Sequence, residues 1–478
     1  MSIKKENPKV DFVKNEHEIL DYWSKNKTFE KLVEKNSNGP KWSFLDGPIT
    51  ANNPMGVHHA WGRTLKDLYQ RYKSMNGHQL RYQNGFDCQG LWVEIEVEKE
   101  LEIKSKKEVE DLGIEKFVNL CKERVEKFSE VQKDQSIRLG YWMDWDNSYF
   151  TMSEENNYAI WAFLKKLHED EKIYRGTDVV PWSGRSGTSY SQMEIIEGRK
   201  LTVHKGVFVK FPLKDKENEN ILIWTTTPWT LSSNIAVAVN KKINYAKIKA
   251  NDGSIYFVAE TNLKYQRLNK EFAEKKNWVD GVPKLKTLDQ IFKERGGYEI
   301  LEVIKGEKLI GLTYQGPFDH LEPQGSKGGY PIHDTSNLQD KSAIDCHIII
   351  DGGKDSEGND MVVEGEGTGF VHMAGGCGAI DNKICKREGF VEISPIDNQA
   401  NFIQGFDFMS GLSVTDPETA QKIISNLKER DLLLYVEDYP HIYPHCWRSG
   451  DELVFKQVDE WYINMDWRNK IKSVVDEI

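Results

Sequence analysis

The chain has 478 residues, of which 38% are hydrophobic and 29% are charged, and its formal net charge is −11. This length exceeds one ordinary hydrophobic core, so two or three domains are expected. No apolar run reaches the roughly 18 residues of a membrane-spanning helix, so none is predicted. The acidic balance argues against a protein that coats nucleic acid.

The cysteines and the N-terminus indicate a compartment. The first residues lack the apolar stretch of a secretion signal. Cysteines in a long chain without such a signal are expected to be reduced and mostly buried, so we predict a cytoplasmic protein. None of the six forms a C-x-x-C pair: Cys88, Cys121, Cys346, Cys377, Cys385 and Cys446.

The N-terminal part has the pattern of an α/β fold. Apolar residues at helical spacing predict a helix over 11–35, and a short apolar run predicts a buried strand over 42–45. A second amphipathic helix is predicted over 64–75, and a second strand follows within 78–90. This order of elements predicts a βαβ unit, the opening of a Rossmann-like, doubly wound parallel sheet.

The pattern changes near residue 200. Before it, long helices are predicted over 107–133 and 154–171. After it, alternating β-rich runs separated by Gly and Asp/Asn turns continue to about residue 395, which we interpret as a β-rich domain inserted into the first. A strand-like pattern returns from Pro440, before a short final helix. The predicted domains are 1–199, 200–400 and 401–478.

Two adjacent histidines, His58 and His59, follow a Pro-Met-Gly turn and precede the helix of the βαβ unit. Neighbouring side chains on a helix point about 100° apart, so this pair is a poor metal site. Ordinary packing of one ring is an alternative. The third interpretation is a phosphate site, because helix N-termini at the carboxyl end of a strand offer free N–H groups to anions.

The stretch 45–94 resembles the opening of class I aminoacyl-tRNA synthetases, most closely the isoleucyl subgroup, in "DGP…AN", "LKD…RYK.M.G" and "G.DC.GL..E". In that family an H-I-G-H signature binds the ATP phosphates and stabilises the adenylation transition state. Here the signature falls on 56–59, with Gly56 in place of the first histidine and His58 in place of the glycine. The resemblance implies that His58 and His59 are catalytic and that Gly56 and His59 bind ATP. A side chain at His58 is expected to crowd the nucleotide.

The same resemblance assigns two residues to the amino-acid substrate. Asp87 matches the aspartate that binds the ammonium group, a role that suits a carboxylate at a strand end, although an ordinary loop aspartate is the alternative. Trp461 matches an aromatic residue that borders the isoleucine pocket. ATP with Mg²⁺ is implied as a substrate.

A threonine-rich stretch, "IWTTTPWTLSSN", covers 223–234. Composition alone allows an edge strand closed by Pro228. In isoleucyl, valyl and leucyl enzymes, however, such a stretch belongs to the inserted editing (CP1) domain, where hydroxyls line the pocket for the terminal adenosine of mischarged tRNA. The matching residues are Thr225, Thr226, Thr227, Thr230 and Asn234.

The partner stretch of the editing domain covers 365–382. Its G-x-G-x-G pattern does not predict a dinucleotide site, because β-like residues follow instead of a helix. By resemblance, His372 positions the ester or water and Asp381 holds the ammonium group of the noncognate amino acid. The stretch departs from the family pattern at Gly375, which replaces a proline, and at Ile380, which replaces an aspartate.

Some relatives hold zinc between two C-x-x-C pairs near the return to the catalytic domain. The corresponding positions here are Ser183, Ser186, Cys446 and Ser449. One thiol does not make a structural zinc site, so no metal is predicted.

The family's second signature, K-M-S-K-S, is not found; "KSKK" at 104–107 lies too early and precedes a charged helix, as a solvated surface does. No anticodon-binding helical domain follows. The resemblance therefore covers about the first half of a synthetase, and we expect a truncated chain or a fragment.

The resemblance implies an isoleucine–tRNA ligase that acts on ATP, isoleucine and tRNA(Ile), as a monomer. Editing of Val-tRNA is expected because a hydrophobic pocket discriminates one methylene poorly. The alternatives are a valyl-tRNA synthetase, a deacylase that only edits, and a catalytically silent tRNA- or protein-binding paralogue.

Overall fold

The computed structural model describes residues 10–44, 46–265, 285–331, 340–354, 358–365, 367–447 and 449–477. The chain forms two compact units. The first, here called the N-terminal unit, consists of Met1–Ile173 and Ile463–Ile478, and the second, the inserted unit, is Tyr174–Tyr462. These bounds differ from the predicted 1–199, 200–400 and 401–478, because strands near residues 175–212 and 433–462 pair within the inserted unit.

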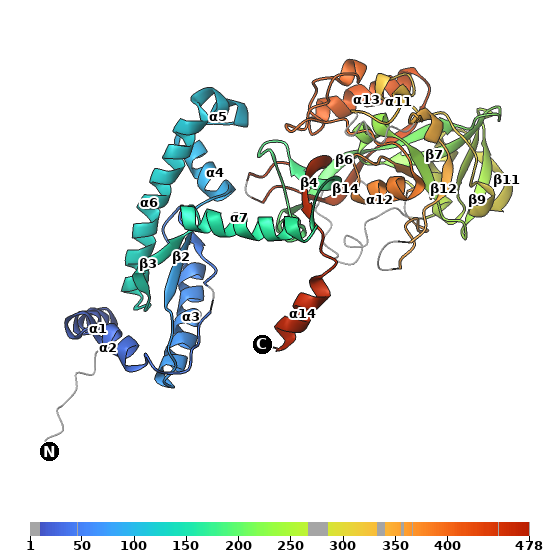
Figure 1. Cartoon of the computed structure of the whole chain (residues 1–478). Coiled ribbons are helices and arrows are strands. Elements are labelled where there is room, and N and C mark those ends of the chain that lie inside the picture. Colours follow the sequence, from blue (N-terminus) through green and yellow to red (C-terminus); the bar gives the residue numbers. More distant parts are fainter. Residues whose placement is uncertain are drawn as a thin grey trace. The chain divides into compact units, whose positions relative to one another are not determined.

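The N-terminal unit contains one short sheet and the longest helices (Figure 1). Its strands are β1 (Ile49–Thr50), β2 (Gln83–Asp87) and β3 (Asp144–Phe150). Its helices are α1 (Phe12–Asn26), α2 (Thr28–Lys35), α3 (Val57–Met75), α4 (Leu91–Glu100), α5 (Lys106–Leu112), α6 (Ile114–Arg138), α7 (Glu154–Glu169) and α14 (Arg468–Glu477).

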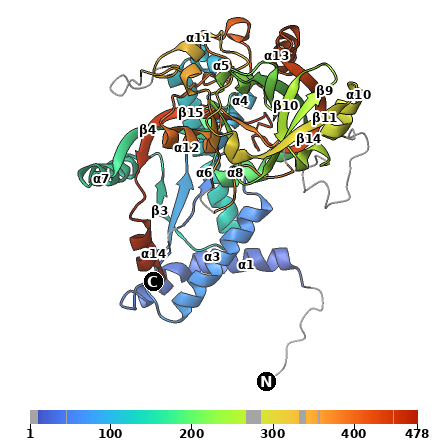
Figure 2. The ribbon, with the colours of Figure 1, turned by 90° about the vertical axis from the view of Figure 1, so that its right-hand side faces the viewer.

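The inserted unit is rich in strands, which Figure 2 shows from a second side. They are β4 (Ile173–Ser183), β5 (Thr188–Ser189), β6 (Arg199–Pro212), β7 (Glu219–Thr225), β8 (Ala236–Val239), β9 (Asn244–Ala250), β10 (Ile255–Ala259), β11 (Tyr298–Lys305), β12 (Ile349–Asp351), β13 (Val371–Met373), β14 (Leu433–Pro444) and β15 (Val454–Ile463). Its helices are α8 (Gln192–Glu197), α10 (Leu288–Glu294), α11 (Glu322–Gly325), α12 (Ala379–Glu388) and α13 (Pro417–Glu429).

The sheet of the N-terminal unit confirms the predicted βαβ unit. Its order is β1-β2-β3 and both pairings are parallel, with Thr50 opposite Asp87. Helix α3 makes the crossover from β1 to β2, as parallel neighbours require. Ala51, Phe86 and Val93 are buried together behind the carboxyl edge of the sheet. The loop after β1, which leads to His58 and His59, therefore begins at a backbone position that the sheet and its buried cluster hold in place.

The predicted strand over 42–45 is wrong for residues 42–44, and Leu45 lies outside the described residues. One parallel bridge joins Lys41 to Gln79, and the first strand proper is β1. Trp42 and Phe44 nevertheless pack against a buried cluster, so burial alone accounts for the apolar run that suggested a strand.

Two predicted helices are each divided by a residue in the left-handed or a related conformation. The helix over 11–35 is interrupted at Lys27, with φ 51°, where α1 ends and α2 begins. The helix over 107–133 is interrupted at Gly113, with φ 99°, a conformation that glycine adopts without a steric penalty. Helix α3 is longer than the predicted 64–75, because it already begins at Val57.

The inserted unit is built on a mixed six-stranded sheet with the order β11-β9-β10-β7-β6-β14. β14 pairs antiparallel with β6 along nearly its whole length, from Leu433 opposite Val209 to Pro444 opposite Arg199. A second, three-stranded sheet has the order β12-β8-β13. The alternating runs predicted near 201–260 correspond to β6 to β10, and their inward residues form the largest core cluster.

The positions that hold the zinc-binding C-x-x-C pairs in some relatives lie close together here, and hydrogen bonds connect several of them. The Ser183 hydroxyl donates to Asp451 over 2.6 Å, and Ser449 also bonds to this carboxylate. Cys446 Sγ accepts from the Ser449 N–H at 3.2 Å and lies 2.9 Å from the Tyr190 hydroxyl. This donor set, with one thiol and a carboxylate already paired with hydroxyls, does not suit zinc.

Across the described parts of the chain, no helix combines the length and the apolar character that crossing a membrane would need.

Candidate functional site

The first candidate site is the start of helix α3. Gly56 is the N-cap residue, and its backbone N–H donates to Nδ1 of His59 over 3.2 Å. Because Nδ1 accepts this hydrogen bond, the neutral ring of His59 carries its proton on Nε2. Burial, and then the nearby charges of His58 and Arg63, lower the pKa of His59. His59 is thus an oriented hydrogen-bond donor beside the free N–H groups of a helix start, where an anion is favoured.

The ring of His58 lies beside Gly56 and against the ring of His59. The ring centroids of His58 and His59 are 3.8 Å apart. A Cβ atom on Gly56 would lie 2.9 Å from Cε1 and 3.0 Å from Nδ1 of His58, closer than real Cβ contacts. A side chain at residue 56 would therefore require the exposed ring of His58 to move, which links the two departures from the signature.

Asp87 ends strand β2 beside the last residue of β1. The Thr50 hydroxyl donates to Asp87 Oδ2 over 2.7 Å, and the N–H of Ala51 donates to the Asp87 carbonyl over 2.9 Å. The carboxylate is thereby oriented at the carboxyl edge of the parallel sheet, where open α/β folds bind ligands. Trp461 belongs to the inserted unit, on β15, and is 70% exposed.

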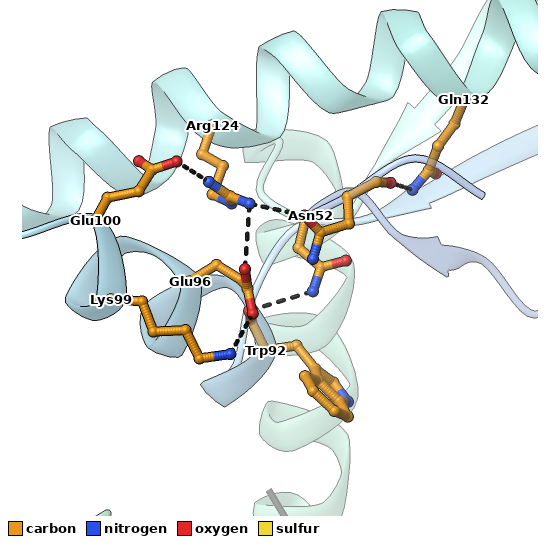
Figure 3. A network of polar contacts seen from close by, with 8 residues as sticks. Asn52, Trp92, Glu96, Lys99, Glu100, Arg124 and Gln132 are labelled. Carbon is orange, nitrogen blue, oxygen red and sulfur yellow. Dashed lines mark hydrogen bonds and ion pairs between the residues drawn. The ribbon is translucent and has the colours of Figure 1, made fainter. Parts of the chain in front are cut away.

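The loop between β1 and α3 is held by helices α4 and α6, as Figure 3 shows. The side chain of Gln132 donates to the carbonyls of Thr50 and Asn53 over 2.9 and 2.8 Å. Farther along the loop, the Met55 N–H donates to Gln135 over 2.7 Å. These bonds satisfy backbone N–H and C=O groups of the loop, which is not part of a β-sheet and so lacks the hydrogen bonds of a strand.

Arg124 is the central cation of this network. It is 8% exposed and donates to the side chain of Asn53 over 2.8 Å, while it also pairs with Glu96 and Glu100 on α4. A buried guanidinium needs such partners, since an unpaired charge is costly to bury. Arg124 therefore ties the loop that precedes the two histidines to helix α4.

Replacing Arg124 by methionine is expected to loosen this loop. Loss of the charged hydrogen bonds lowers the local opening free energy of 50–55 by about 1 to 3 kcal/mol, so its amides exchange hydrogen faster. Native-state hydrogen exchange on the whole chain measures the effect. Lys122→Met, at an exposed position of the same helix, is the control. Equal protection in the two variants would contradict the assigned role of Arg124.

The second candidate site is a cavity of about 800 Å³ within the inserted unit. It is bordered by the threonine-rich stretch, the loop before β13, the start of α12 and strand β14. The lining residues are Trp224, Thr225, Thr226, Thr227, Trp229, Thr230, Tyr265, Val363, Glu364, Gly365, Gly367, Phe370, Val371, His372, Ala374, Cys377, Asp381, Tyr439, His441, Tyr443 and Phe455.

The threonines of this stretch have different tasks. Thr225 is buried, and its hydroxyl accepts the N–H of Thr227 over 3.0 Å, which closes the turn after β7. Thr230 donates its hydroxyl proton to the Thr227 carbonyl over 2.8 Å. Among the described residues, no partner is recorded for the hydroxyls of Thr226 and Thr227, so they are available to a ligand in the cavity.

His372 joins this stretch to strand β13. Its Nε2 lies 3.0 Å from the Thr230 hydroxyl, whose own proton is committed to Thr227. His372 therefore donates from Nε2 and carries a lone pair on Nδ1, which is buried and has no hydrogen-bond partner among the described residues. Burial lowers the pKa of His372 to about 4. The ring is neutral at physiological pH and accepts, rather than donates, at Nδ1.

Asp381 supplies the acidic group of the cavity, from the first turn of α12. Its Oδ2 accepts the N–H of Ala374 over 2.9 Å. Burial raises the pKa of this carboxyl to about 6. Asp381 is a half-buried carboxylate that borders the cavity and has no paired cation within the described ranges, so it is a good site for a ligand's ammonium group.

The departure at Gly375 has a local cause. A Cβ atom there would lie 2.9 Å from Cys385 Sγ, which is fully buried on α12. The thiol of Cys385 therefore leaves room only for glycine at residue 375, and a proline there would need a smaller side chain at residue 385.

Sequence matching and geometry differ at some positions. Asn234 is not among the lining residues: its amide donates to the carbonyl of Ala236, and its oxygen accepts the Tyr314 hydroxyl over 2.7 Å. Conversely, the family motifs in the sequence do not include the cavity wall that β14 forms. Tyr439, His441 and Tyr443 recur every second residue, which places them on one face of a strand and would have been the available signal.

In the described part of the chain, no group of three or more His, Cys, Asp or Glu side chains is arranged to hold a metal ion.

Comparisons with known proteins identify the family of this chain. The family model for class I tRNA synthetases (I, L, M and V) matches residues 18–478. The isoleucine–tRNA ligase of Clostridium tetani is 35% identical over 462 residues, and that of Pyrococcus horikoshii is 32% identical over 467 residues. Each alignment covers 97% of this chain and 39% of the relative, so the chain spans about two fifths of their length.

Among solved structures, the leucyl-tRNA synthetase of a ternary complex from Agrobacterium radiobacter aligns over 92% of this chain and 50% of that one. Its identity is 12% and its TM-score 0.34, so the family assignment depends on the sequence match. By that match, the chain belongs to the family of class I tRNA synthetases for isoleucine, leucine, methionine and valine.

Proposed function

We propose that this chain is part of an isoleucine–tRNA ligase that also hydrolyses mischarged Val-tRNA. In the synthetic reaction, the isoleucine carboxylate attacks the α-phosphorus of ATP, which is bound with Mg²⁺, and the adenylate then transfers isoleucine to tRNA(Ile). Such a reaction needs alignment and charge stabilisation more than covalent chemistry. The oriented Nε2–H of His59 at the α3 N-terminus suits a phosphate oxygen, and Asp87 suits the ammonium group.

The observation that carries the editing part is the cavity of about 800 Å³ in the inserted unit. Thr230 and His372, which are 142 residues apart in the sequence, are in hydrogen-bond contact at this cavity, and Asp381 also lines it. A volume of this order suits a ligand of several hundred cubic ångströms, such as an aminoacylated adenosine. The free hydroxyls of Thr226 and Thr227 suit its ribose, and Asp381 suits the ammonium group of valine.

The relatives' names favour isoleucine over valine as the cognate amino acid, since both are called isoleucine–tRNA ligase. A valyl enzyme is the second candidate for specificity. A deacylase that only edits is the second candidate for activity, because the whole editing cavity lies within one compact unit.

Two assays on the whole chain test the proposal. Hydrolysis of Val-tRNA(Ile), with Ile-tRNA(Ile) spared, is expected from an isoleucyl editing site. Preference for Thr-tRNA(Val) would instead indicate a valyl enzyme, because threonine is the isostere that a valine pocket admits. Isoleucine-dependent ATP–pyrophosphate exchange tests the synthetic site. Hydrolysis without exchange would support the deacylase, and failure of both assays would leave only a silent paralogue.

A further inference from the structure

Three ionisable side chains outside the matched motifs form a hydrogen-bonded chain at the wall of the editing cavity. Nε2 of His441, on β14, lies 2.9 Å from Nδ1 of His204, on β6. Nε2 of His204 in turn lies 3.2 Å from both carboxylate oxygens of Glu452, before β15. His441 lines the cavity, whereas His204 and Glu452 lie behind it. We call this set the Glu452–His204–His441 relay.

The strand register explains why the rings meet. Tyr439 is opposite His204 in the β6–β14 ladder, so His441 is the diagonal neighbour of His204 on the same face. Glu452 is held near the pair because its backbone bridges to His445, one residue past the end of β14. Two neighbouring elements of the sheet therefore fix the order of the three groups.

The hydrogen bonds determine where the protons lie. Burial alone would raise the pKa of Glu452, but the hydrogen bond from His204 and the charges of His204, His445 and His441 outweigh it and lower the pKa. An ionised Glu452 only accepts, so His204 carries its proton on Nε2 and accepts at Nδ1. His441 must then donate from Nε2, which leaves a lone pair on its Nδ1. No described residue hydrogen-bonds to that Nδ1.

The state of His441 at neutral pH fits a proton acceptor. Burial, and then the charge of His204, lower the pKa of His441 to about 4, against an opposing effect of Glu452. The ring is therefore neutral at physiological pH, and because it is a weak base, a proton that it accepts is expected to move on to His204, whose other nitrogen is bonded to Glu452. The other titratable groups around the relay are Tyr439, Tyr443 and His445.

We propose that His441, oriented by His204 and Glu452, accepts the proton of the attacking water when the cavity hydrolyses a mischarged aminoacyl ester. The water oxygen bonds to the ester carbonyl carbon and its proton moves to His441 Nδ1, while His441 Nε2–H passes its proton to His204 Nδ1. The positive charge then lies on His204 beside Glu452. Return of the proton to the departing ribose oxygen breaks the ester bond and restores the relay. This inference rests on the proposed editing function.

Single-turnover hydrolysis of Val-tRNA(Ile) by the whole chain tests the inference. His441→Asn is expected to lower the rate constant on the order of 100-fold, the usual contribution of a positioned base. Glu452→Gln, which touches no cavity atom, is expected to lower it at least about tenfold, because a carboxylate orients its imidazole. The protein concentration that gives half of the maximal rate is expected to stay unchanged. The double variant, His441→Asn with Glu452→Gln, is expected to be no slower than His441→Asn alone. Asp438→Asn, on the same strand and paired with exposed Lys205, is the control.

Nitrogen-15 NMR of the imidazole rings provides a readout that a merely structural role does not move. In the wild type, His441 and His204 both show the Nε2–H tautomer, and Glu452→Gln shifts the His441 resonances although the two residues do not touch. If the wild type hydrolyses Val-tRNA and both relay variants match it, the inference is overturned while the proposed function stands. If the wild type does not hydrolyse, the proposed function fails, and unshifted His441 resonances in Glu452→Gln would remove the relay as well.

Discussion

Asparagine in place of Asp381 is expected to abolish most editing and, at the same time, to stabilise the inserted unit above pH 7. The substitution removes the proposed partner of the substrate's ammonium group. Such a partner is worth about 2 to 4 kcal/mol, which corresponds to roughly a 30- to 1,000-fold fall in kcat/KM for Val-tRNA(Ile) hydrolysis. The amide still accepts the N–H of Ala374, so the local fold is retained. Isoleucine-dependent ATP–pyrophosphate exchange, the proposed synthetic activity, is expected to stay unchanged.

The stability effect follows from the direction of the pKa shift. Burial raises the pKa of Asp381 from 3.8 to about 6, so the folded chain binds this proton more tightly than the unfolded chain does. The associated stability is present below pH 3.8 and is lost as pH rises through about 6. Asparagine mimics the protonated form at all pH values. The variant is therefore expected to be more stable by up to about 3 kcal/mol at pH 7.5, and by less than about 1 kcal/mol near pH 4.

Urea unfolding at the two pH values, combined with the hydrolysis assay, checks this prediction. Asp438→Asn controls for the loss of one negative charge, since Asp438 is exposed and paired with Lys205. A purely structural Asp381 would show destabilisation at pH 7.5 together with lost hydrolysis, and that outcome would contradict a site whose buried charge is kept for its ligand.

Local patterns predicted much of this molecule. The alternating runs near 201–260 predict β6 to β10 because a half-buried strand repeats every second residue. The crossover through α3 to β2 follows from an amphipathic helix with a strand after it, although the first strand, β1, lies at Ile49–Thr50 and not at the predicted 42–45. His372 and Asp381 border one cavity, in line with the motif that contains both.

Long-range pairing accounts for most of what was missed. His204 and His441 are separated by 237 positions and meet only through the β6–β14 ladder, for which the sequence has no local signal. The family resemblance assigns Asn234 to the editing pocket, but its side-chain oxygen accepts the hydroxyl of Tyr314, 80 residues away, which no local pattern indicates. The apolar run at 42–44 suggested a strand because burial and strand formation produce the same pattern over so few residues.

Restoring the usual order of the signature is expected to work only when both positions change. Gly56→His alone brings its Cβ to 2.9 Å from Cε1 of His58, so the exposed ring has to move away, and ATP binding is expected to weaken by at most about tenfold. His58→Gly alone removes the exposed ring beside Gly56 and places glycine in the first turn of α3; tighter ATP binding in this variant would support the crowding expected from the sequence, and weaker binding would contradict it. The double variant relieves the contact and returns an imidazole to the vacant place.

A double-mutant cycle on ATP affinity, measured by calorimetry with the whole chain, should therefore give a favourable coupling of about 1 to 2 kcal/mol. The backbone of Gly56 is extended, with φ −79° and ψ 169°, so histidine meets no conformational strain there. His58→Ala separates loss of the ring from the helix cost of glycine. Additive effects would mean that His58 is not a substitute for the first histidine of the signature. Coupling would mean that the exchanged order, Gly56 with His58, keeps one imidazole near the phosphates from a different backbone position, beside the oriented Nε2–H of His59.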